Sequence, residues 1–195
     1  MQEGTKHSYI GLDIMHNQNT DRVSVGQSGD VLNRFAHVMH DARGNGRVPC
    51  GPEIVQPEMD ENPEADRSLY MSIVMSVMFL ARFTRPDLMF TVSMLTTHCA
   101  NPNQLHMKYA IRLLKYIAST ADMVIVYKSA MLNPIIYADA SHATHHDGKG
   151  HGCIIVVIDT GIIYCRSYKL RIITLSSTES EFVAVCDAST LSLNG

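Results

Sequence analysis

The chain has 195 residues, of which 46% are hydrophobic and 18% charged, so it can bury one sizeable core or two small ones and is neither disordered nor fibrous. Its formal net charge of -3 is not that of a strongly basic nucleic-acid binder. The first 66 residues hold 5 Lys and Arg against 11 Asp and Glu, and the rest hold 11 against 8. Any attraction to a phosphate-rich partner is therefore expected in the later part of the chain.

No targeting or membrane segment is evident in the sequence. The opening residues MQEGTKHSYIGLD have no apolar core behind a basic end, and the most apolar run, residues 69–81, is shorter than the roughly 20 residues of a membrane span. The five cysteines form no CxxC pair and their number is odd, which favours small buried hydrophobes in a reducing compartment over disulfides or a cysteine zinc site. We therefore expect an intracellular protein, in the cytoplasm or the nucleus, with no membrane partner.

The first third of the chain is predicted to hold a hairpin, a helix and a linker. Residues 9–14 (YIGLDI) and 22–25 (RVSV) alternate as strands do, on either side of a polar turn. Residues 28–42 carry apolar side chains at helical spacing, and Asp30 is available as the N-cap. Glycines and prolines interrupt residues 43–63, which indicates a linker.

Three helices are predicted next. Residues 68–83 are apolar on nearly every face, so this helix should be buried on most sides. The second helix, residues 86–99, has Pro86 in its first turn and Asp87 at its positive end. In the third, residues 103–118, a solvated face is favoured over a nucleic-acid groove as the explanation of three outward basic residues, which are Lys108, Arg112 and Lys115.

From residue 123 the pattern is that of strands followed by one helix. Four short β-branched and aromatic runs occupy residues 123–127, 134–140, 152–158 and 161–167. Tight-turn signals between the last three predict an antiparallel meander. The final segment, TLSSTESEFVAVCDAST, is predicted to be a helix with a capping box formed by Ser176 and Glu179. Its apolar stripe is predicted to consist of Phe182, Val183, Val185 and Cys186.

Asp139 is an acidic residue inside a run that otherwise reads as a buried strand, where an unpaired charge is costly. If that strand is central and lies under the last helix, the carboxylates of Asp139 and Glu181 can point at one spot. Two carboxylates suit Mg²⁺, and two such ions would stabilise the attacking and leaving oxygens of a phosphodiester. The alternative is that Asp139 caps a turn and Glu181 lies on a solvated helix face. Spacing alone favours this alternative.

Several motifs, in their order along the chain, resemble the polyprotein of copia-type LTR retrotransposons. They are YMSIVMSVMFLARFTRPDLMF, NPNQLHMKYAIRLLKYIASTADMVIVY, YADASHA, KGHG and LSSTESEFVAV. These resemble the end of the reverse transcriptase, its connecting helices and the start of the ribonuclease H domain, while YIGLDI resembles a strand downstream of the polymerase active site. The resemblance spans nearly the whole chain.

The resemblance implies an α+β fold, in which a helical connection segment precedes a partial ribonuclease H-like fold made of an antiparallel three-stranded meander plus a helix. It divides the chain into a reverse transcriptase remnant at residues 1–66, connecting helices at 67–128 and a truncated ribonuclease H-like domain at 129–195. The activity implied is cleavage of the RNA strand in RNA/DNA hybrids, with Mg²⁺ or Mn²⁺ as the cofactor.

The resemblance also implies roles for individual residues. Asp139 and Glu181 match the first two metal-binding, catalytic carboxylates. Gly150 and Gly152 match glycines where the backbone approaches the hybrid. Hydroxyl groups at the helix entry match substrate contacts, namely those of Ser176, Ser177 and Thr178. Basic side chains just before the helix are candidates for phosphate contacts or for a plain surface, and these are Arg166, Lys169 and Arg171.

The sequence also departs from the family pattern. The Y-x-D-D hairpin of the polymerase is absent, so the resemblance excludes DNA synthesis by this chain. The family's third aspartate and last acidic residue are expected beyond Gly195, and Asp187 is not placed to replace them. Whether the chain is an enzyme is therefore left open by its sequence. One hypothesis is a polyprotein fragment of ribonuclease H ancestry, incomplete or inactive alone; the other is a domesticated, non-catalytic scaffold or subunit whose open sheet edge pairs with another chain.

The histidine-rich loop HATHHDGKGH invites a zinc interpretation. Its candidates are His142, His145, His146 and His151. A turn between two strands defines no tetrahedral geometry and no cysteine joins the histidines, so a solvated hairpin is favoured, followed by a role for one histidine near the catalytic centre.

Overall fold

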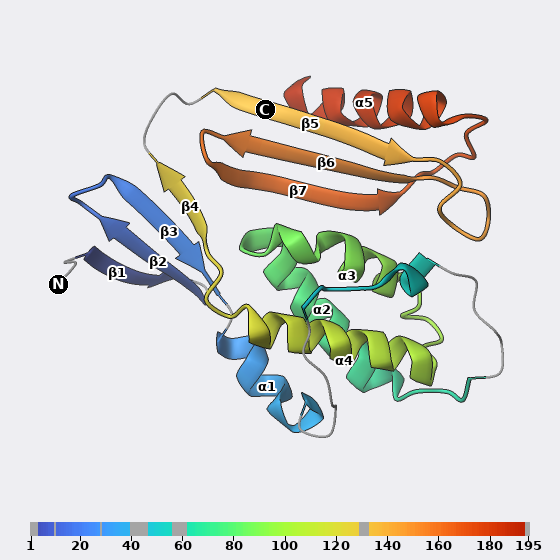
Figure 1. The fold of residues 1–195 in the computed structure, drawn as a ribbon, viewed down its shortest axis with the longest axis horizontal. Coiled ribbons are helices and arrows are strands. Elements are labelled where there is room, and N and C mark those ends of the chain that lie inside the picture. The colour runs from blue at the N-terminus through green and yellow to red at the C-terminus, as the bar shows by residue number, and fades with distance from the viewer. Residues whose placement is uncertain are drawn as a thin grey trace.

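The computed structural model describes residues 4–9, 11–27, 29–39, 47–55, 62–128 and 133–193, and within them the fold is α+β. Two antiparallel sheets meet where β4 contacts β7, and the helices α2, α3 and α4 lie together below the second sheet and beside the first (Figure 1). The strands are β1 (Gly4–Tyr9), β2 (Leu12–Asn17), β3 (Arg22–Gly26), β4 (Ile125–Lys128), β5 (Pro134–Ser141), β6 (His151–Ile158) and β7 (Gly161–Lys169). The helices are α1 (Gly29–Met39), η1 (Pro52–Val55), α2 (Arg67–Phe83), η2 (Pro86–Leu88), α3 (Met89–Thr96), α4 (Gln104–Ser119) and α5 (Ser177–Leu193).

The first sheet has the strand order β1-β2-β3-β4 and is antiparallel throughout. The predicted hairpin is confirmed by β2 and β3, but the predicted strand at residues 9–14 is divided, because Gly11 adopts a positive φ of 73° between β1 and β2. The strand predicted at residues 123–127 is confirmed as β4. It hydrogen bonds to β3, with Val25 opposite Ile125, and so adds a fourth strand to a sheet whose other strands lie about 100 positions earlier in the chain.

The helices α1 to α4 form the main core. Tyr70, Leu80, Leu114 and Ile117 are fully buried there, and Phe35 of α1 packs into the same cluster. Asp66 caps α2 by accepting a hydrogen bond from the Leu69 N–H group.

Two other helix starts in this region carry buried polar side chains, namely Arg85 before η2 and His106 in the first turn of α4. Asn103 and His106 form a reciprocal capping box at the start of α4. Arg85, which is 2% exposed, donates to both carboxylate oxygens of Asp87 and to Thr120, and its guanidinium lies 5.5 Å from the centre of the Tyr116 ring. All three guanidinium nitrogens of the buried cation therefore donate hydrogen bonds to two residues, Asp87 and Thr120.

The helix predictions are confirmed for α2 and α4, with several differences in detail. The helix α1 begins at Gly29, so Asp30 lies inside it and is not its N-cap. The second predicted helix is a 3₁₀ turn followed by α3, which ends at Thr96. The segment predicted as a linker, residues 43–63, contains one short 3₁₀ helix, η1, and residues 40–46 and 56–61 lie outside the described part. The helix α2 is less buried than predicted, since one stripe at four-residue spacing is exposed, namely Met71, Met75, Phe79 and Phe83.

The second sheet has the order β5-β6-β7 and confirms the predicted antiparallel meander. Among the described strands β6 is central, so the expectation that the Asp139 strand is central is wrong; β5 lies at an edge. The helix α5 packs on one face of this sheet, chiefly over β5, and α3 lies against the other face, as Figure 1 shows.

The contact face of α5 differs from the prediction. Ser180, Ala184 and Ala188 are buried against the sheet, whereas Phe182 and Val185 are 68% and 54% exposed and Cys186 is also exposed. The small side chains let the helix backbone approach the strands closely. The predicted apolar stripe is therefore wrong for Phe182, Val185 and Cys186, and only Val183 packs towards the core. Among the described residues no helix has the length and apolarity needed to cross a bilayer.

Candidate functional site

Asp139 lies near the end of the edge strand β5 and is exposed. It is directly opposite Cys153 of β6, which in turn is opposite Ser167 of β7. Directly opposed residues of an antiparallel sheet share a face, so these three side chains form a row across the sheet. Phe90 of α3 lines the same cavity as this row, so the row is on the face that looks towards α3.

Glu181 lies in the second turn of α5 and is exposed. Its neighbours orient the helix: Ser180 and Ala184 face the sheet, and Val183 packs on a cluster that contains Tyr168 of β7. At 3.6 residues per turn, Glu181 is about 160° around the helix from Val183. Glu181 therefore lies on the flank of α5 opposite the one that packs on this cluster.

The residues that bear the two predicted carboxylates thus lie on different faces of the second sheet, both close to its β5 edge. Asp139 is on the α3 face, and Glu181 is on the helix that covers the opposite face. Within the described ranges no group of three or more His, Cys, Asp and Glu side chains is arranged to hold a metal ion. The shared cation remains a prediction.

Gly150 and Gly152 are buried between the strands and α5. A Cβ atom on Gly150 would overlap the carbonyl oxygen of Ser141, and on Gly152 it would lie 2.9 Å from the ring of Tyr168. Both glycines therefore have a packing reason to be glycine that is independent of any substrate.

Replacing Gly150 with alanine is expected to lower the free energy of unfolding by about 2 kcal/mol, because the backbone carbonyl of Ser141 cannot move aside without disturbing β5. Thermal denaturation followed by circular dichroism measures this change. The control is Ser177→Ala, at an exposed position in the first turn of α5, which should cost less than about 0.5 kcal/mol. Equal stability of the two variants would contradict the packing role of Gly150.

The predicted helix entry is capped nearly as expected. The Ser176 hydroxyl oxygen accepts a hydrogen bond of 3.2 Å from the Glu179 N–H group. The Glu179 carboxylate accepts from the Leu175 N–H group at 2.6 Å, one residue before the partner of a standard capping box. Ser177 and Thr178 are exposed in the first turn, so all three hydroxyl-bearing residues lie together at one end of α5.

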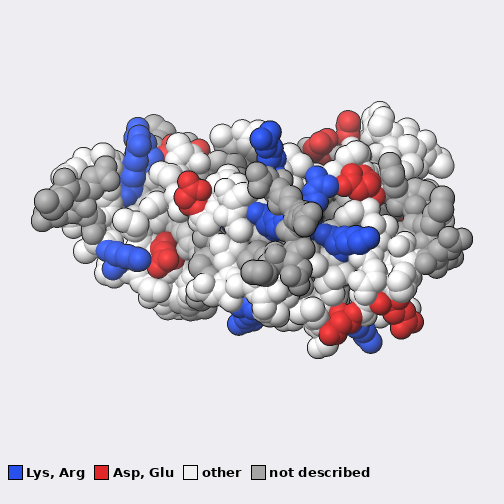
Figure 2. Space-filling view, turned by 60° about the horizontal axis from the view of Figure 1, so that its bottom comes forward, with Lys and Arg blue, Asp and Glu red and all other residues white. Residues whose placement is uncertain are grey.

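The three basic candidates before α5 point in different directions. Lys169 pairs with Asp147 at 2.8 Å, and Arg166 lies over the Tyr168 ring with 4.2 Å between the guanidinium carbon and the ring centre. Three positions apart on one strand, Arg166 and Lys169 occupy opposite faces. Arg171 is exposed beyond the strand. On the face drawn in Figure 2, basic and acidic side chains are interspersed rather than gathered into one patch.

Two histidines of the predicted loop connect it to the sheet. His145 Nε2 lies 2.9 Å from His151 Nδ1, and His151 Nε2 lies 2.6 Å from the Ser167 hydroxyl. The Phe90 ring meets His151 edge-on at 5.1 Å. His142 makes a separate hydrogen bond of 3.2 Å to Thr174, and His146 is exposed. The loop is therefore tied down by hydrogen bonds instead of being a simple solvated hairpin.

Burial changes the acid–base properties of this pair. Burial and, to a smaller extent, repulsion by the neighbouring His145 together lower the pKa of His151 to about 4. The pKa of His145 is lowered by burial and by Lys169, while Asp147 acts in the opposite direction. Hydrogen bonding from Lys169 lowers the pKa of Asp147. Both rings are therefore neutral at pH 7, and neither offers a charge to a substrate.

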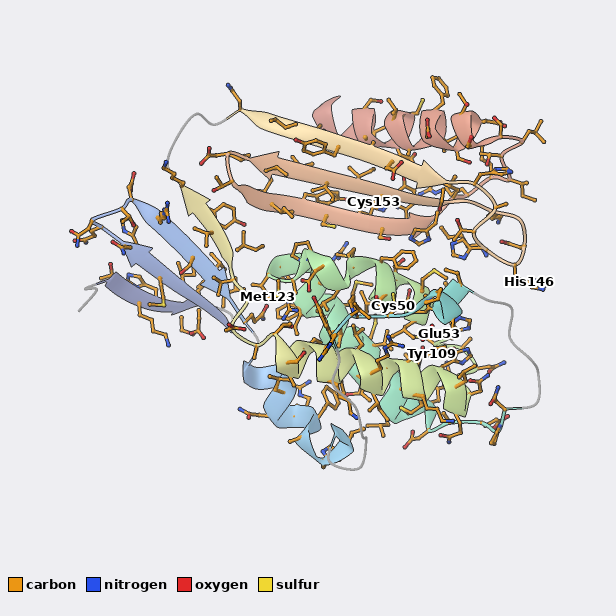
Figure 3. The ribbon with its side chains drawn as sticks, in the orientation of Figure 1. Cys50, Glu53, Tyr109, Met123, His146 and Cys153 are labelled. Atoms are coloured by element: carbon orange, nitrogen blue, oxygen red, sulfur yellow. The ribbon has the colours of Figure 1, made fainter. Side chains whose placement is uncertain are left out.

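Sequence reasoning missed a cavity of about 250 Å³ between this sheet and the segment from η2 to α3. Its polar lining includes Asp139, His151, Cys153, Cys165 and Ser167. The signal that could have revealed this cavity is the alternation along β5, β6 and β7. Polar or sulfur-bearing side chains recur at alternate positions of these strands, and alternate positions share one face of the sheet. Figure 3 shows Cys153 on the central strand, above α3.

Comparisons with known proteins show similarity to transposon proteins. The chain is 32% identical over 125 residues, 63% of its length, to a transposon Ty5-1 protein of Saccharomyces cerevisiae, of which it spans 41%. It is 33% identical over 126 residues to the retrovirus-related Pol polyprotein from transposon RE2 of Arabidopsis thaliana, and spans 9% of that protein. No family model matches the chain, and no solved structure matches it significantly.

A third relative is matched over most of its own length. The chain is 31% identical over 121 residues, 61% of its length, to secreted RxLR effector protein 161 of Plasmopara viticola, and covers 85% of that protein. The aligned lengths and identities are close to those of the transposon relatives. The chain therefore belongs to the sequence family that this effector protein shares with retrotransposon and retrovirus-related Pol polyproteins.

Proposed function

We propose that the chain is a fragment of a copia-type reverse transcriptase and ribonuclease H polyprotein, and that residues 133–193 descend from its ribonuclease H domain. The observation that carries the proposal is the position of Asp139 near the end of β5, at the edge of the described second sheet, with the Glu181-bearing helix α5 packed chiefly over that strand. The order of a helical segment, a three-stranded meander and one helix also supports it. The substrate would be the RNA strand of an RNA/DNA hybrid, in the cytoplasm or the nucleus.

Asp139 and Glu181 are the residues that would hold Mg²⁺ or Mn²⁺. Both carboxylates are exposed, and Mg²⁺ commonly binds through one or two carboxylates while keeping several waters, so the donor set fits a weakly held ion. The ion would supply Lewis-acid stabilisation of the phosphodiester. A complete two-metal centre needs more carboxylates than these two. Any cleavage by this chain alone is therefore expected to be weak.

The test is incubation of the purified chain with Mg²⁺ and a hybrid labelled on its RNA strand. Weak cleavage is expected, and Asp139→Asn should reduce its rate at least about tenfold, since it removes one carboxylate charge from the ion. Asp159→Asn is the matched control, because Asp159 is exposed in the β6–β7 turn and its φ of 52° is one that asparagine tolerates. Cleavage that survives Asp139→Asn would contradict the assignment.

The second candidate is a non-catalytic scaffold or subunit. The observation that favours it is the edge of β5, where Ile135, Ile136 and Tyr137 are 52%, 37% and 57% exposed and where no described strand pairs with one side of β5. Such an edge suits pairing with a strand of another chain. Absence of hybrid cleavage in both wild type and Asp139→Asn would favour this candidate over the nuclease.

A further inference from the structure

A serine and two histidines form a continuous hydrogen-bonded chain at the end of the second sheet where β6 begins. The Oγ atom of Ser167 lies 2.6 Å from His151 Nε2, and His151 Nδ1 lies 2.9 Å from His145 Nε2. Ser167 is 9% exposed and His151 is 5% exposed, and both line the cavity of about 250 Å³ between this sheet and α3. The serine hydroxyl is therefore buried, paired with an imidazole and adjacent to a space that a small molecule can enter.

Three contacts fix the orientation of the His151 ring. Hydrogen bonds hold both ring nitrogens, and the Phe90 ring meets the imidazole edge-on at 5.1 Å. His145 is itself held by a turn, because its N–H group donates to the Lys149 carbonyl and its carbonyl accepts from the Gly148 N–H group. A serine bonded to a base that a third group orients is the arrangement by which enzymes activate a hydroxyl group as a nucleophile.

The chain can carry the serine proton to His151. A neutral imidazole has one N–H group and one lone pair. When the proton of His151 is on Nδ1, the ring donates to His145 Nε2 and presents its lone pair at Nε2 to the hydroxyl of Ser167. An imidazole with the ordinary pKa of about 6.5 is already mostly neutral at pH 7, so the availability of this base does not depend on a shifted pKa.

A second serine of the same cavity provides an internal comparison. Ser141 is exposed, and its hydroxyl bonds to the Thr144 hydroxyl and to the His151 carbonyl oxygen, neither of which is a base comparable to an imidazole nitrogen. Accessibility alone would direct an acylating reagent to Ser141. Activation by an imidazole would direct the reagent to Ser167.

The cavity restricts the kind of reagent. Its volume is below the roughly 300–1,000 Å³ of pockets that hold drug-sized ligands, so it suits a small molecule. Met89, Phe90 and Ile155 make part of its lining apolar, and the carboxylate of Asp139 disfavours anions. The backbone at Ser167 is paired with β6, so an ester whose leaving group departs readily is the most suitable substrate. Small, uncharged aryl esters meet these requirements.

We propose that Ser167 is an acylation site for small uncharged aryl esters, with His151 as its general base and His145 as the residue that positions this base. The Ser167 oxygen attacks the ester carbonyl carbon while its proton passes to His151 Nε2. A new C–O bond to Ser167 forms, the bond to the aryloxide breaks, and the aryloxide leaves with the electron pair and takes up the proton from His151. The acyl group stays on Ser167 until water hydrolyses the ester.

The experiment treats the full chain with p-nitrophenyl acetate at pH 7 in the presence of EDTA. The chelator separates this reaction from the proposed hybrid cleavage, which needs Mg²⁺ or Mn²⁺. Release of nitrophenol measures the rate. Peptide mass mapping follows treatment with neutral hydroxylamine, which removes acetyl groups from cysteine thiols, and should find the acetyl group on Ser167. Acetylation of Ser141 with none on Ser167, or the absence of any adduct on Ser167, would overturn the proposal.

Variants of the chain test the two histidine roles. His151→Gln should slow acetylation of Ser167 at least about a hundredfold, because it removes the base. His145→Phe should slow it about tenfold, whereas His145→Gln keeps an acceptor for the His151 N–H group and should restore most of the rate. Ser141→Ala should leave the rate unchanged. Circular dichroism confirms that each variant is folded. An unchanged rate in folded His151→Gln, or equal rates in His145→Phe and His145→Gln, would overturn these assignments.

Discussion

Asp87→Ala is expected to lower the free energy of unfolding by about 3 kcal/mol. The carboxylate of Asp87 accepts two hydrogen bonds, of 3.0 and 2.9 Å, from the guanidinium of Arg85, which is 2% exposed. Removing one partner of such a pair leaves a buried, uncompensated charge and typically costs about 3–5 kcal/mol. The Asp87 side chain is 28% exposed, so water can reach part of the pair and the lower end of this range is expected. Urea denaturation followed by circular dichroism measures the loss.

Asp13→Ala provides the matched control for this prediction. Asp13 lies 3.7 Å from Lys6, but both side chains are more than half exposed, so its removal should cost less than about 1 kcal/mol. A second control removes both buried charges, as Arg85→Met with Asp87→Leu, and should recover most of the stability because no lone charge remains. A loss in Asp87→Ala no larger than that in Asp13→Ala would show that the buried pair contributes little.

Acidification is expected to cost the protein about 3 kcal/mol through His151 alone. Burial and His145 lower the pKa of His151 from 6.5 to about 4 in the folded state, so the unfolded chain binds a proton that the folded chain resists. The contribution of His151 is complete above about pH 6.5 and is lost as the pH falls towards 4. At 1.36 kcal/mol per pKa unit, the difference amounts to about 3 kcal/mol.

The measurement is urea denaturation at pH 7 and pH 4 in the wild type and in His151→Gln. The fall in stability between the two pH values should be about 3 kcal/mol smaller in His151→Gln, whatever that substitution costs at pH 7. His146→Gln, at an exposed position of the same loop, should show the wild-type pH dependence. Because His145 and His151 share a hydrogen bond, their titrations are coupled and the fall should extend over more than one pH unit. Identical pH dependence in His151→Gln and the wild type would refute the prediction.

Local patterns were enough to predict much of the fold. The α2 and α4 helices follow from apolar spacing, and the β5–β7 meander follows from alternation between tight turns. Two features could not be predicted in this way. The pairing of β3 with β4 depends on how the intervening helices pack, and the contact face of α5 consists of small residues that a search for large apolar side chains passes over.

The candidate site was predictable only in part. The motifs predict Asp139 and Glu181 as metal ligands, but the placement of these two residues depends on which strand is at the edge and on the rotation of α5, and a short motif encodes neither. Gly150 was interpreted as a substrate contact, yet its surroundings show a steric requirement within the protein. The cavity lined by Asp139, Cys153 and Ser167 went unnoticed because these residues are far apart in the sequence and meet only through the strand register.

The pairing of β3 with β4 has a consequence for synthesis of the protein. It joins residues about 100 positions apart, with Arg22 opposite Lys128. On the ribosome, the ribbon of β1, β2 and β3 leaves the exit tunnel long before its fourth strand has been translated, and it presents an open edge throughout that interval. Completion of the first sheet must therefore follow translation of the helical segment, which makes its formation a late event that slow translation or chaperone binding would influence.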